Sequence, residues 1–280
     1  MKSSTIKLIV FSVLFVNIPT FGQSSLVGPG SSYTSIFSPS SAATYSVPGG
    51  GGFLSVTLAN GTAETTSGIW DLKAQGGANA TLLGGSLLDS SAQTQLTGTA
   101  LKFDINNSPS SLLGFLGVGT SIHYGWDATA TFNTSGSEID YTPNTTYHVS
   151  FDVNGNHGLL NSIAGVTPTF EFELVDGNGN PLTDTASGTL INIAGLLGTG
   201  VPSGTINLDY TVNGTAPVGP IGVRFIGDAT VGATALGQGT DFATVTNLNI
   251  TASPVPEPGG GLLIGVIGML ALVRRHRRMR

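Results

Sequence analysis

The heptapeptide Tyr147-His-Val-Ser-Phe-Asp-Val153 indicates the fold class, because apolar and polar side chains alternate along it. Successive side chains of a β-strand point to opposite faces, so its four odd-numbered residues form one apolar face. The same alternation occurs in Thr169-Phe-Glu-Phe-Glu-Leu-Val175, in Thr205-Ile-Asn-Leu-Asp-Tyr-Thr-Val212 and in residues 122–127. One apolar and one polar face per strand is typical of antiparallel sheets. The sequence therefore predicts an all-β protein built from antiparallel strands.

Strand candidates and turn signals continue on both sides of this heptapeptide. Further apolar runs occur at residues 53–59, 69–73, 96–105, 221–226 and 242–251. Residue pairs that tolerate the positive φ of tight turns occur at Asn60-Gly61, Asn154-Gly155, Asp176-Gly177, Asn178-Gly179 and Asn213-Gly214. We expect one β-sandwich or jelly roll over residues 50–252, with two smaller domains as the alternative. Residues 23–49 are rich in Ser, Gly and Pro and are predicted to form a loose lead-in.

The charged residues are few and unevenly placed. Only 9% of the 280 residues are charged, and most of the ten Lys and Arg residues lie near the two chain ends. Between Lys7 and Arg274, the three cations Lys73, Lys102 and Arg224 stand against sixteen carboxylates, a formal charge of −13. A surface this acidic repels phosphate backbones, so we expect no nucleic-acid binding. The absence of cysteine excludes disulfides and thiolate metal sites.

The first 22 residues have the pattern of a signal peptide. Lys2 and Lys7 make the start basic, and an apolar run covers residues 8–16. The small residues Thr20 and Gly22 suit the positions three residues and one residue before a cleavage site. An N-terminal anchor or a buried strand is the alternative, but the run is shorter than the ~20 residues that span a membrane. We therefore expect an N-terminal signal-peptide helix, cleaved between Gly22 and Gln23, and an exported chain.

The last residues, 253–280, combine a proline stalk, an apolar segment and a basic end. Ser253-Pro-Val-Pro-Glu-Pro258 is expected to be extended, because proline breaks regular structure. The 15 apolar residues 259–273 would form a helix roughly 22 Å long, shorter than a hydrocarbon core of about 30 Å. A basic cluster that stops transfer and stays in the cytoplasm follows, made of Arg274, Arg275, Arg277, Arg278 and Arg280.

These three parts, in this order at the chain end, resemble a PEP-CTERM sorting domain whose motif is Pro256, Glu257 and Pro258. The resemblance covers residues 253–280. It implies a C-terminal transmembrane helix over residues 259–273, transient membrane insertion, and processing by exosortase, a membrane-embedded enzyme. It also implies release or transfer to the surface of a Gram-negative-type bacterium, often one that makes exopolysaccharide. An ordinary single-pass anchor is the alternative interpretation of the same tail.

A second resemblance concerns the middle of the chain. Pro143-Asn-Thr-Thr-Tyr147, the strand after it, residues 170–180 and a last strand before the tail are similar in layout to galactose-binding-like jelly rolls. Carbohydrate-binding modules share that layout, so the resemblance implies attachment to exopolysaccharide as a function. An aromatic sugar platform would draw on Trp70, Tyr124, Trp126 and Tyr141. Aromatic side chains on strands are more often core residues, and Trp126 is assigned to the core because it shares a face with Ile122.

One loop offers oxygen ligands for a metal ion. Asp176-Gly-Asn-Gly-Asn180 is followed by Asp184, so the carboxylates and amides of Asp176, Asn178, Asn180 and Asp184 fall within nine residues. Calcium prefers such hard oxygen ligands in a turn, and the spacing imitates the start of an EF-hand loop without its final glutamate. A plain hairpin turn explains the same residues equally well, so calcium and no cofactor at all remain alternatives.

The remaining candidate residues favour no catalysis. No nucleophile, metalloprotease or phosphate-loop motif occurs. Glu171 and Glu173 share one strand face and would suit a glycoside hydrolase, but two solvated carboxylates on an outer face are the simpler interpretation. His123 and His148 are expected to be solvated. We therefore predict a non-enzymatic cell-surface or extracellular-matrix protein, with a carbohydrate-binding module as the first alternative and a glycoside hydrolase as the second.

Overall fold

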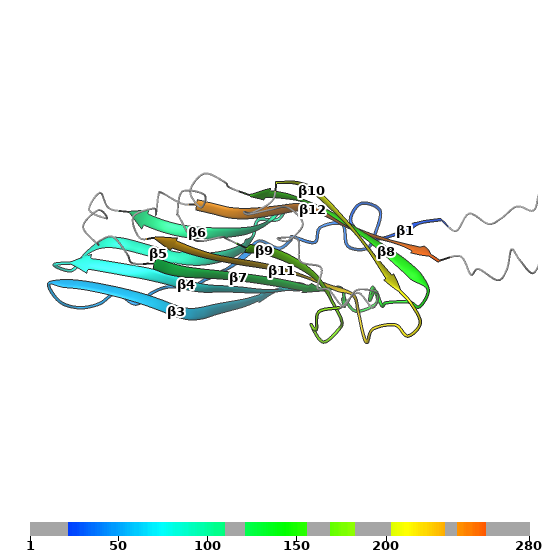
Figure 1. The fold of residues 1–280 in the computed structure, drawn as a ribbon, viewed down its shortest axis with the longest axis horizontal. Coiled ribbons are helices and arrows are strands. Elements are labelled where there is room, and N and C mark those ends of the chain that lie inside the picture. The colour runs from blue at the N-terminus through cyan, green and yellow to red at the C-terminus, as the bar shows by residue number, and fades with distance from the viewer. Residues whose placement is uncertain (1–21, 110–120, 156–168, 183–202, 233–239, 256–280) are drawn as a thin grey trace, which may run out of the picture.

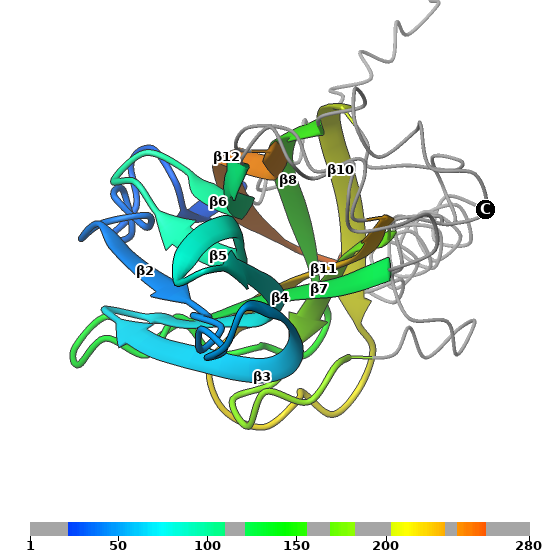
Figure 2. The same cartoon turned by 90° about the vertical axis from the view of Figure 1, so that its left-hand side faces the viewer.

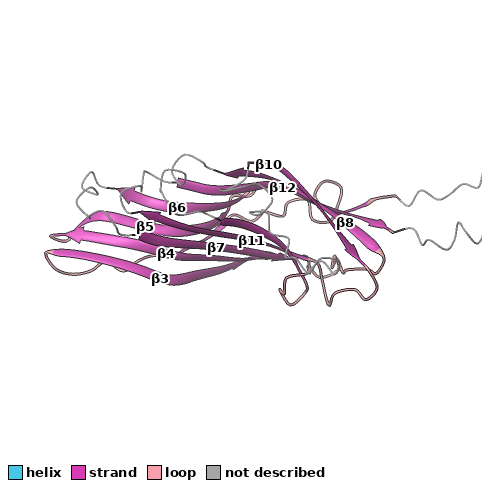
Figure 3. Cartoon of the chain, in the orientation of Figure 1, coloured by secondary structure: helices cyan, strands magenta, loops and turns pink. Residues whose placement is uncertain are grey.

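A computed structural model describes residues 22–109, 121–155, 169–182, 203–232 and 240–255, and all regular structure in these residues is β-strand (Figure 3). The strands are β1 (Ser24–Val27), β2 (Ser41–Thr44), β3 (Leu54–Ser67), β4 (Trp70–Leu82), β5 (Gly85–Leu96), β6 (Leu101–Pro109), β7 (Ser121–Thr131), β8 (Thr145–Gly155), β9 (Thr169–Val175), β10 (Ser203–Val212), β11 (Gly222–Gly232) and β12 (Thr240–Pro254). The predicted all-β class is therefore confirmed.

The strands form one antiparallel sheet with the order β10-β8-β12-β6-β5-β4-β7-β11-β9. Three further strands lie off this path, because β1 pairs with β12, β2 with β5, and β3 with β4. The sheet is strongly curled, so that β8 and β10 lie across from β7 and β11 (Figures 1 and 2). All pairings between these strands are antiparallel, as the alternating sequence runs predicted.

The hydrophobic core fills the space inside the curl, where rings from opposite parts of the sheet meet. Phe151 of β8 lies 4.8 Å from Phe172 of β9 between ring centroids. Trp126 of β7 stacks on Phe242 of β12 at 4.5 Å. Such aromatic contacts add specific geometry to the burial of apolar area. They join strands that are far apart in the sheet order, so one core holds both halves of the curl.

The strand faces predicted from alternation are confirmed. The apolar face of β8 is fully buried, and so are Phe170, Phe172 and Leu174 of β9. In β7, the side chains of Ile122, Tyr124 and Trp126 also face the core. The polar side chains between them point to the outer face of the sheet, where the charged residues described below lie.

Residues 23–49 are not the loose lead-in that their composition predicted. They contribute β1 and β2, and Tyr33, Ile36 and Phe37 are buried. The Trp70 indole Nε1 donates a hydrogen bond of 2.6 Å to the Ile36 carbonyl, which ties this segment to β4. The segment is therefore part of the folded domain, because a few apolar residues among the Ser and Gly reach the core.

Two local predictions also differ from the structure. The run at 96–105 is broken by a turn in which the Thr97 amide donates to the Ala100 carbonyl, so it belongs to two strands, β5 and β6. Asn60-Gly61, expected in a turn, lies inside β3, where the pairing with β4 shifts register between Ala59 and Thr62. An extra residue in one strand is a β-bulge, which bends the strand without ending it.

Both ends of the described domain lie at the same end of the molecule. Ser24 of β1 pairs with Ala252 of β12, and β1 and the C-terminal end of β12 lie far from the start of β3 (Figure 1). At the opposite end, the Leu83 amide donates to the Phe53 carbonyl at 2.8 Å and closes what we call the distal tip, residues 53–54 and 83–84. The predicted signal-peptide helix and the predicted helix at 259–273 lie outside the described residues. No helix within the described part of the chain is long and apolar enough to cross a membrane.

Candidate functional site on the outer face of the sheet

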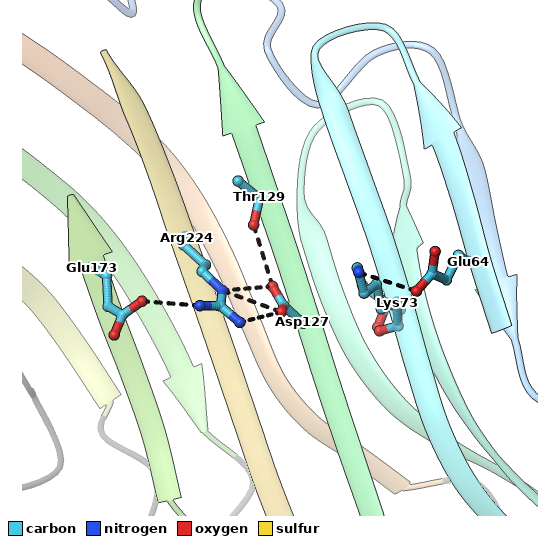
Figure 4. Close-up of polar contacts among 7 residues, drawn as sticks. Glu64, Lys73, Asp127, Thr129, Glu173 and Arg224 are labelled. Carbon is cyan, nitrogen blue, oxygen red and sulfur yellow. Dashed lines mark hydrogen bonds and ion pairs between the residues drawn. The ribbon is translucent and has the colours of Figure 1, made fainter. Parts of the chain in front are cut away.

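A row of alternating charges crosses the outer face of the sheet over five strands (Figure 4). Strand register builds it, because Arg224 of β11 pairs with Glu173 of β9, Asp127 of β7 pairs with Lys73 of β4, and Lys73 pairs with Glu64 of β3. Four of these side chains alternate with buried residues on their strands, so they point away from the core. Glu64 shares their face because it pairs with Lys73. We call these five residues the charge row.

Arg224 is the centre of the charge row. Its Nε donates to both carboxylate oxygens of Asp127 at 3.1 Å, and one terminal nitrogen donates to Asp127 Oδ2 at 2.6 Å. The other terminal nitrogen donates to Glu173 Oε2 at 3.4 Å. The Thr129 hydroxyl donates a hydrogen bond to Asp127 Oδ1 at 3.3 Å. Guanidinium matches carboxylate geometry in this forked way. Arg224 therefore clamps β7, β11 and β9 together.

The two ends of the charge row differ in burial, because the Glu173 side chain on β9 is 8% exposed and the Glu64 side chain on β3 is 62% exposed. Desolvation raises the pKa of the Glu173 carboxyl, and this outweighs the attraction of Arg224. The bonds to Asp127 raise the pKa of Arg224. At the other end, Lys73 Nζ lies 3.0 Å from Glu64 Oε1, and the two side chains are 45% and 62% exposed. The exposed pair is available to a ligand, because surface ion pairs are weakly held.

A groove of about 340 Å³ opens beside the exposed end of the row, over β3, β4, β7 and β11. His123 and Asp228 both line it and contact each other, with His123 Nε2 2.6 Å from Asp228 Oδ2. Gly125 pairs with Asp228, and its missing side chain leaves the depression open. The other lining residues include Thr62, Glu64, Lys73, Gln75 and Asp127.

The side chains that line this groove include a lysine cation and carboxylates. Lys73 and Gln75 supply donors, and the carboxylates supply acceptors. Such a surface can hydrogen-bond a polyhydroxylated ligand without any covalent step. The sequence interpretation missed the groove, because its members come from strands far apart in the chain. The available signal was that Lys73, which lines the groove, is one of only three cations between Lys7 and Arg274.

The calcium candidate forms a closed turn in its described part. Asp176 Oδ1 accepts hydrogen bonds from the Asn178 and Asn180 amides at 2.9 Å, and Oδ2 accepts one from Asn180 Nδ2 at 3.1 Å. Partial desolvation raises the pKa of Asp176, but these bonds outweigh it and hold the pKa below its usual range. Asp184 lies outside the described residues. Within the described ranges, no group of three or more His, Asp or Glu residues is placed to hold a metal ion.

The other candidates from the sequence are placed as follows. Glu171 and Glu173 do share the outer face, but Glu173 is not solvated as expected, because its side chain is only 8% exposed beside Arg224. His148 is part-exposed and contacts Asp209 at 2.7 Å and Ser253 at 2.9 Å. The four aromatic residues considered for a sugar platform are all buried, which confirms the core interpretation: Trp70, Tyr124, Trp126 and Tyr141.

The sorting-motif residues Pro256, Glu257 and Pro258 and the C-terminal arginine cluster lie outside the described residues. No family model and no curated protein matches the chain. Among solved structures, the chain is similar to the infectious bursal disease virus VP2 subviral particle, with 10% identity and a TM-score of 0.21, over 78% of this chain and 76% of that chain. It is also similar to the structure of the infectious bursal disease virus Gt strain, with 14% identity and a TM-score of 0.18, over 79% of this chain and 60% of that one. Neither likeness carries information about ligands or partners.

Proposed function

We propose that this chain is an exported, non-enzymatic cell-surface or extracellular-matrix protein that an exosortase-type enzyme processes at its C-terminal tail. The described strands form its body, a β-sandwich of the jelly-roll type. The observation that carries the proposal is the pairing of β1 with β12, in which Ser24 lies opposite Ala252. The expected cleavage point after Gly22 and the proline stalk after Ser253 therefore leave the domain from one end.

This arrangement suits a domain that is held at one end and displayed at the other. A tail anchored through residues 259–273 would keep the β1–β12 end near the membrane. The distal tip and the outer face of the sheet would then face outward. A retained single-pass anchor gives the same orientation as a processed tail, so the two differ only in whether the tail is removed.

The test is the intact mass of the protein recovered from the cells that export it. We expect a mass that lacks residues 1–22 and part of residues 253–280. A matched variant with Pro256, Glu257 and Pro258 all replaced by alanine should keep the tail and lose only the signal peptide. A cytosolic protein that keeps both ends would overturn the proposal, and a surface protein that keeps only the tail would support the plain anchor.

The groove beside the charge row supports a second candidate function, attachment to exopolysaccharide. Its lining of mixed charge around Gly125 suits hydroxyl-rich ligands. The variant G125W should fill the groove, since a Cβ at this position meets only ordinary contacts at 3.5 Å. We expect G125W to abolish co-sedimentation with the polysaccharide of the producing cells.

The variant T66W is the control, because Thr66 is exposed on the same sheet but does not line the groove. Equal binding by both variants would remove this candidate function. Shortened polysaccharide chains after incubation would instead indicate a glycoside hydrolase.

A further inference from the structure

An apolar stripe lies exposed on β3 next to the distal tip. The side chains of Leu54, Val56 and Leu58 are 45%, 47% and 49% exposed, and Phe53 is 72% exposed. They alternate with Ser55, Thr57 and Ala59, so the stripe occupies one face of the strand. Contiguous exposed apolar residues on a strand mark an interaction surface more often than chance placement does.

The same residues border an open sheet edge. Strand β3 pairs with β4 on one side and has no strand on its other side among the described residues (Figure 2). The Phe53 carbonyl faces β4, where it accepts from Leu83. Backbone groups alternate sides along an antiparallel strand, so those of Leu54, Val56 and Leu58 point to the open edge. One set of three residues therefore offers both apolar side chains and unpaired backbone groups.

The stripe is symmetric about Val56. In an antiparallel pairing of two copies centred there, Val56 meets Val56, and each Leu54 meets the other Leu58. The Asn60-Gly61 bulge bends β3 and shifts its register, so the straight overlap between two copies covers residues 53–59, about 23 Å of strand. The pattern fits a second copy of this chain without any change in register.

Charge also favours this place for contact between two copies. The chain carries −13 between Lys7 and Arg274, but residues 8–63 contain no Asp, Glu, Lys or Arg, and neither do residues 74–88. These two ranges contain the whole distal tip and the β4 residues that pair with the stripe. Two acidic molecules therefore repel each other least where their tips meet.

We propose that two copies of this chain associate through antiparallel pairing of β3 with β3, on a two-fold axis at Val56. Because the strands run antiparallel, the two β1–β12 ends point in opposite directions. If the proposed function holds, such a pair bridges two surfaces tip to tip. The pairing itself follows from β3 and does not depend on how the tail is processed.

A single engineered cysteine tests the axis, since the chain has no cysteine of its own. The full chain carrying V56C is purified from producing cells and treated with a mild oxidant or a short bis-thiol reagent. Directly opposed strand residues lie about 5.5 Å apart between Cα atoms, which a disulfide can span. We expect most of the V56C protein to become a covalent dimer, and T66C, exposed on the same strand beyond the overlap, to stay monomeric.

A second variant measures the association without a cross-link. In V56D, two carboxylates would face each other at the axis, so we expect the dimer dissociation constant to rise more than tenfold in sedimentation, with the fold kept because Val56 is half-exposed. A monomeric wild type would overturn the proposal. So would equal cross-linking of V56C and T66C, or a V56C thiol that is protected within a monomer, which would mean that another part of the same chain covers the stripe. Failure of tail processing leaves these outcomes unchanged and bears only on the proposed function.

Discussion

Replacement of Gly227 by alanine should loosen the joint between the two halves of the curled sheet. Gly227 of β11 lies opposite Trp126, on the core side of the strand. Trp126 stacks on Phe242 with an interplanar angle of 15°, and both rings are buried. A Cβ on Gly227 would lie 2.9 Å from Phe242 Cε1 and 3.1 Å from Trp126 Cε3. The stack can therefore form at its present spacing only if this position has no side chain.

The expected loss follows from two opposing effects. Overpacking a closed core costs about 1–3 kcal/mol. Alanine instead of glycine in a strand recovers about 0.5–1 kcal/mol of backbone entropy, and Gly227 has no positive φ that would add strain. The free energy of unfolding should therefore fall by about 1–2 kcal/mol. Urea unfolding followed by the fluorescence of the two buried tryptophans measures it.

Two further variants separate packing from other causes. The double variant G227A/F242L should lose less than the sum of its single variants by at least about 0.5 kcal/mol, because leucine frees the space that the Cβ needs. The control is G125A on the outer face, where a Cβ meets nothing closer than 3.5 Å, and it should be neutral or slightly stabilising. A neutral G227A, or strictly additive losses in the double variant, would refute the packing argument.

Three other substitutions test the polar contacts. Burial raises the pKa of Glu173 above its usual 4.5, so the stability that its protonated carboxyl contributes is present below pH 4.5 and is lost as the pH rises through the raised pKa. The melting temperature of E173Q relative to the wild type should therefore increase between about pH 4 and about pH 7. A difference in melting temperature that stays constant with pH would contradict this. R224M should lower the free energy of unfolding by about 1–3 kcal/mol, since it leaves Asp127 and Glu173 together without their cation at a partly exposed site. R224K cannot form the forked hydrogen bonds to Asp127, so it should recover only part of this loss in the same urea titration. D176A should cost about 1 kcal/mol through the lost turn bonds. Added calcium should leave the melting temperature of the wild type unchanged, because those oxygens already accept hydrogen bonds within the turn. A rise in melting temperature that D176A abolishes would support the calcium hypothesis.

The missed strand β5 shows where alternation fails as a signal. Its buried positions include Ser90, Ser91 and Thr94, which are polar in the sequence and hide the pattern. Ser90 shares a hydrogen bond with the Tyr124 hydroxyl, and Thr94 donates to the Lys73 carbonyl. Buried hydroxyls are tolerated when they find such partners. Those partners lie on β7 and β4, so no local window of the sequence could reveal them.

The candidate groove was beyond prediction for the same reason. His123 and Asp228 are 105 residues apart in the chain, and only the pairing of β7 with β11 brings them together. The predicted calcium loop, in contrast, could be found because its ligands are neighbours in the sequence. Its described part proved to be a hydrogen-bonded turn, which the same residues also predicted.

The sequence by itself determined which side of each alternating strand is buried, because side-chain direction along a strand depends only on the parity of the position. In this way it placed Phe151, Phe172 and Trp126 in the core. Only the tertiary structure decided which strands are neighbours, and with them the clamp at Arg224, the burial of Glu173 and the meeting of β1 with β12. Backbone hydrogen bonds are the same for every pair of strands, so neighbours are selected by how the core packs as a whole, and that information is spread over the entire chain.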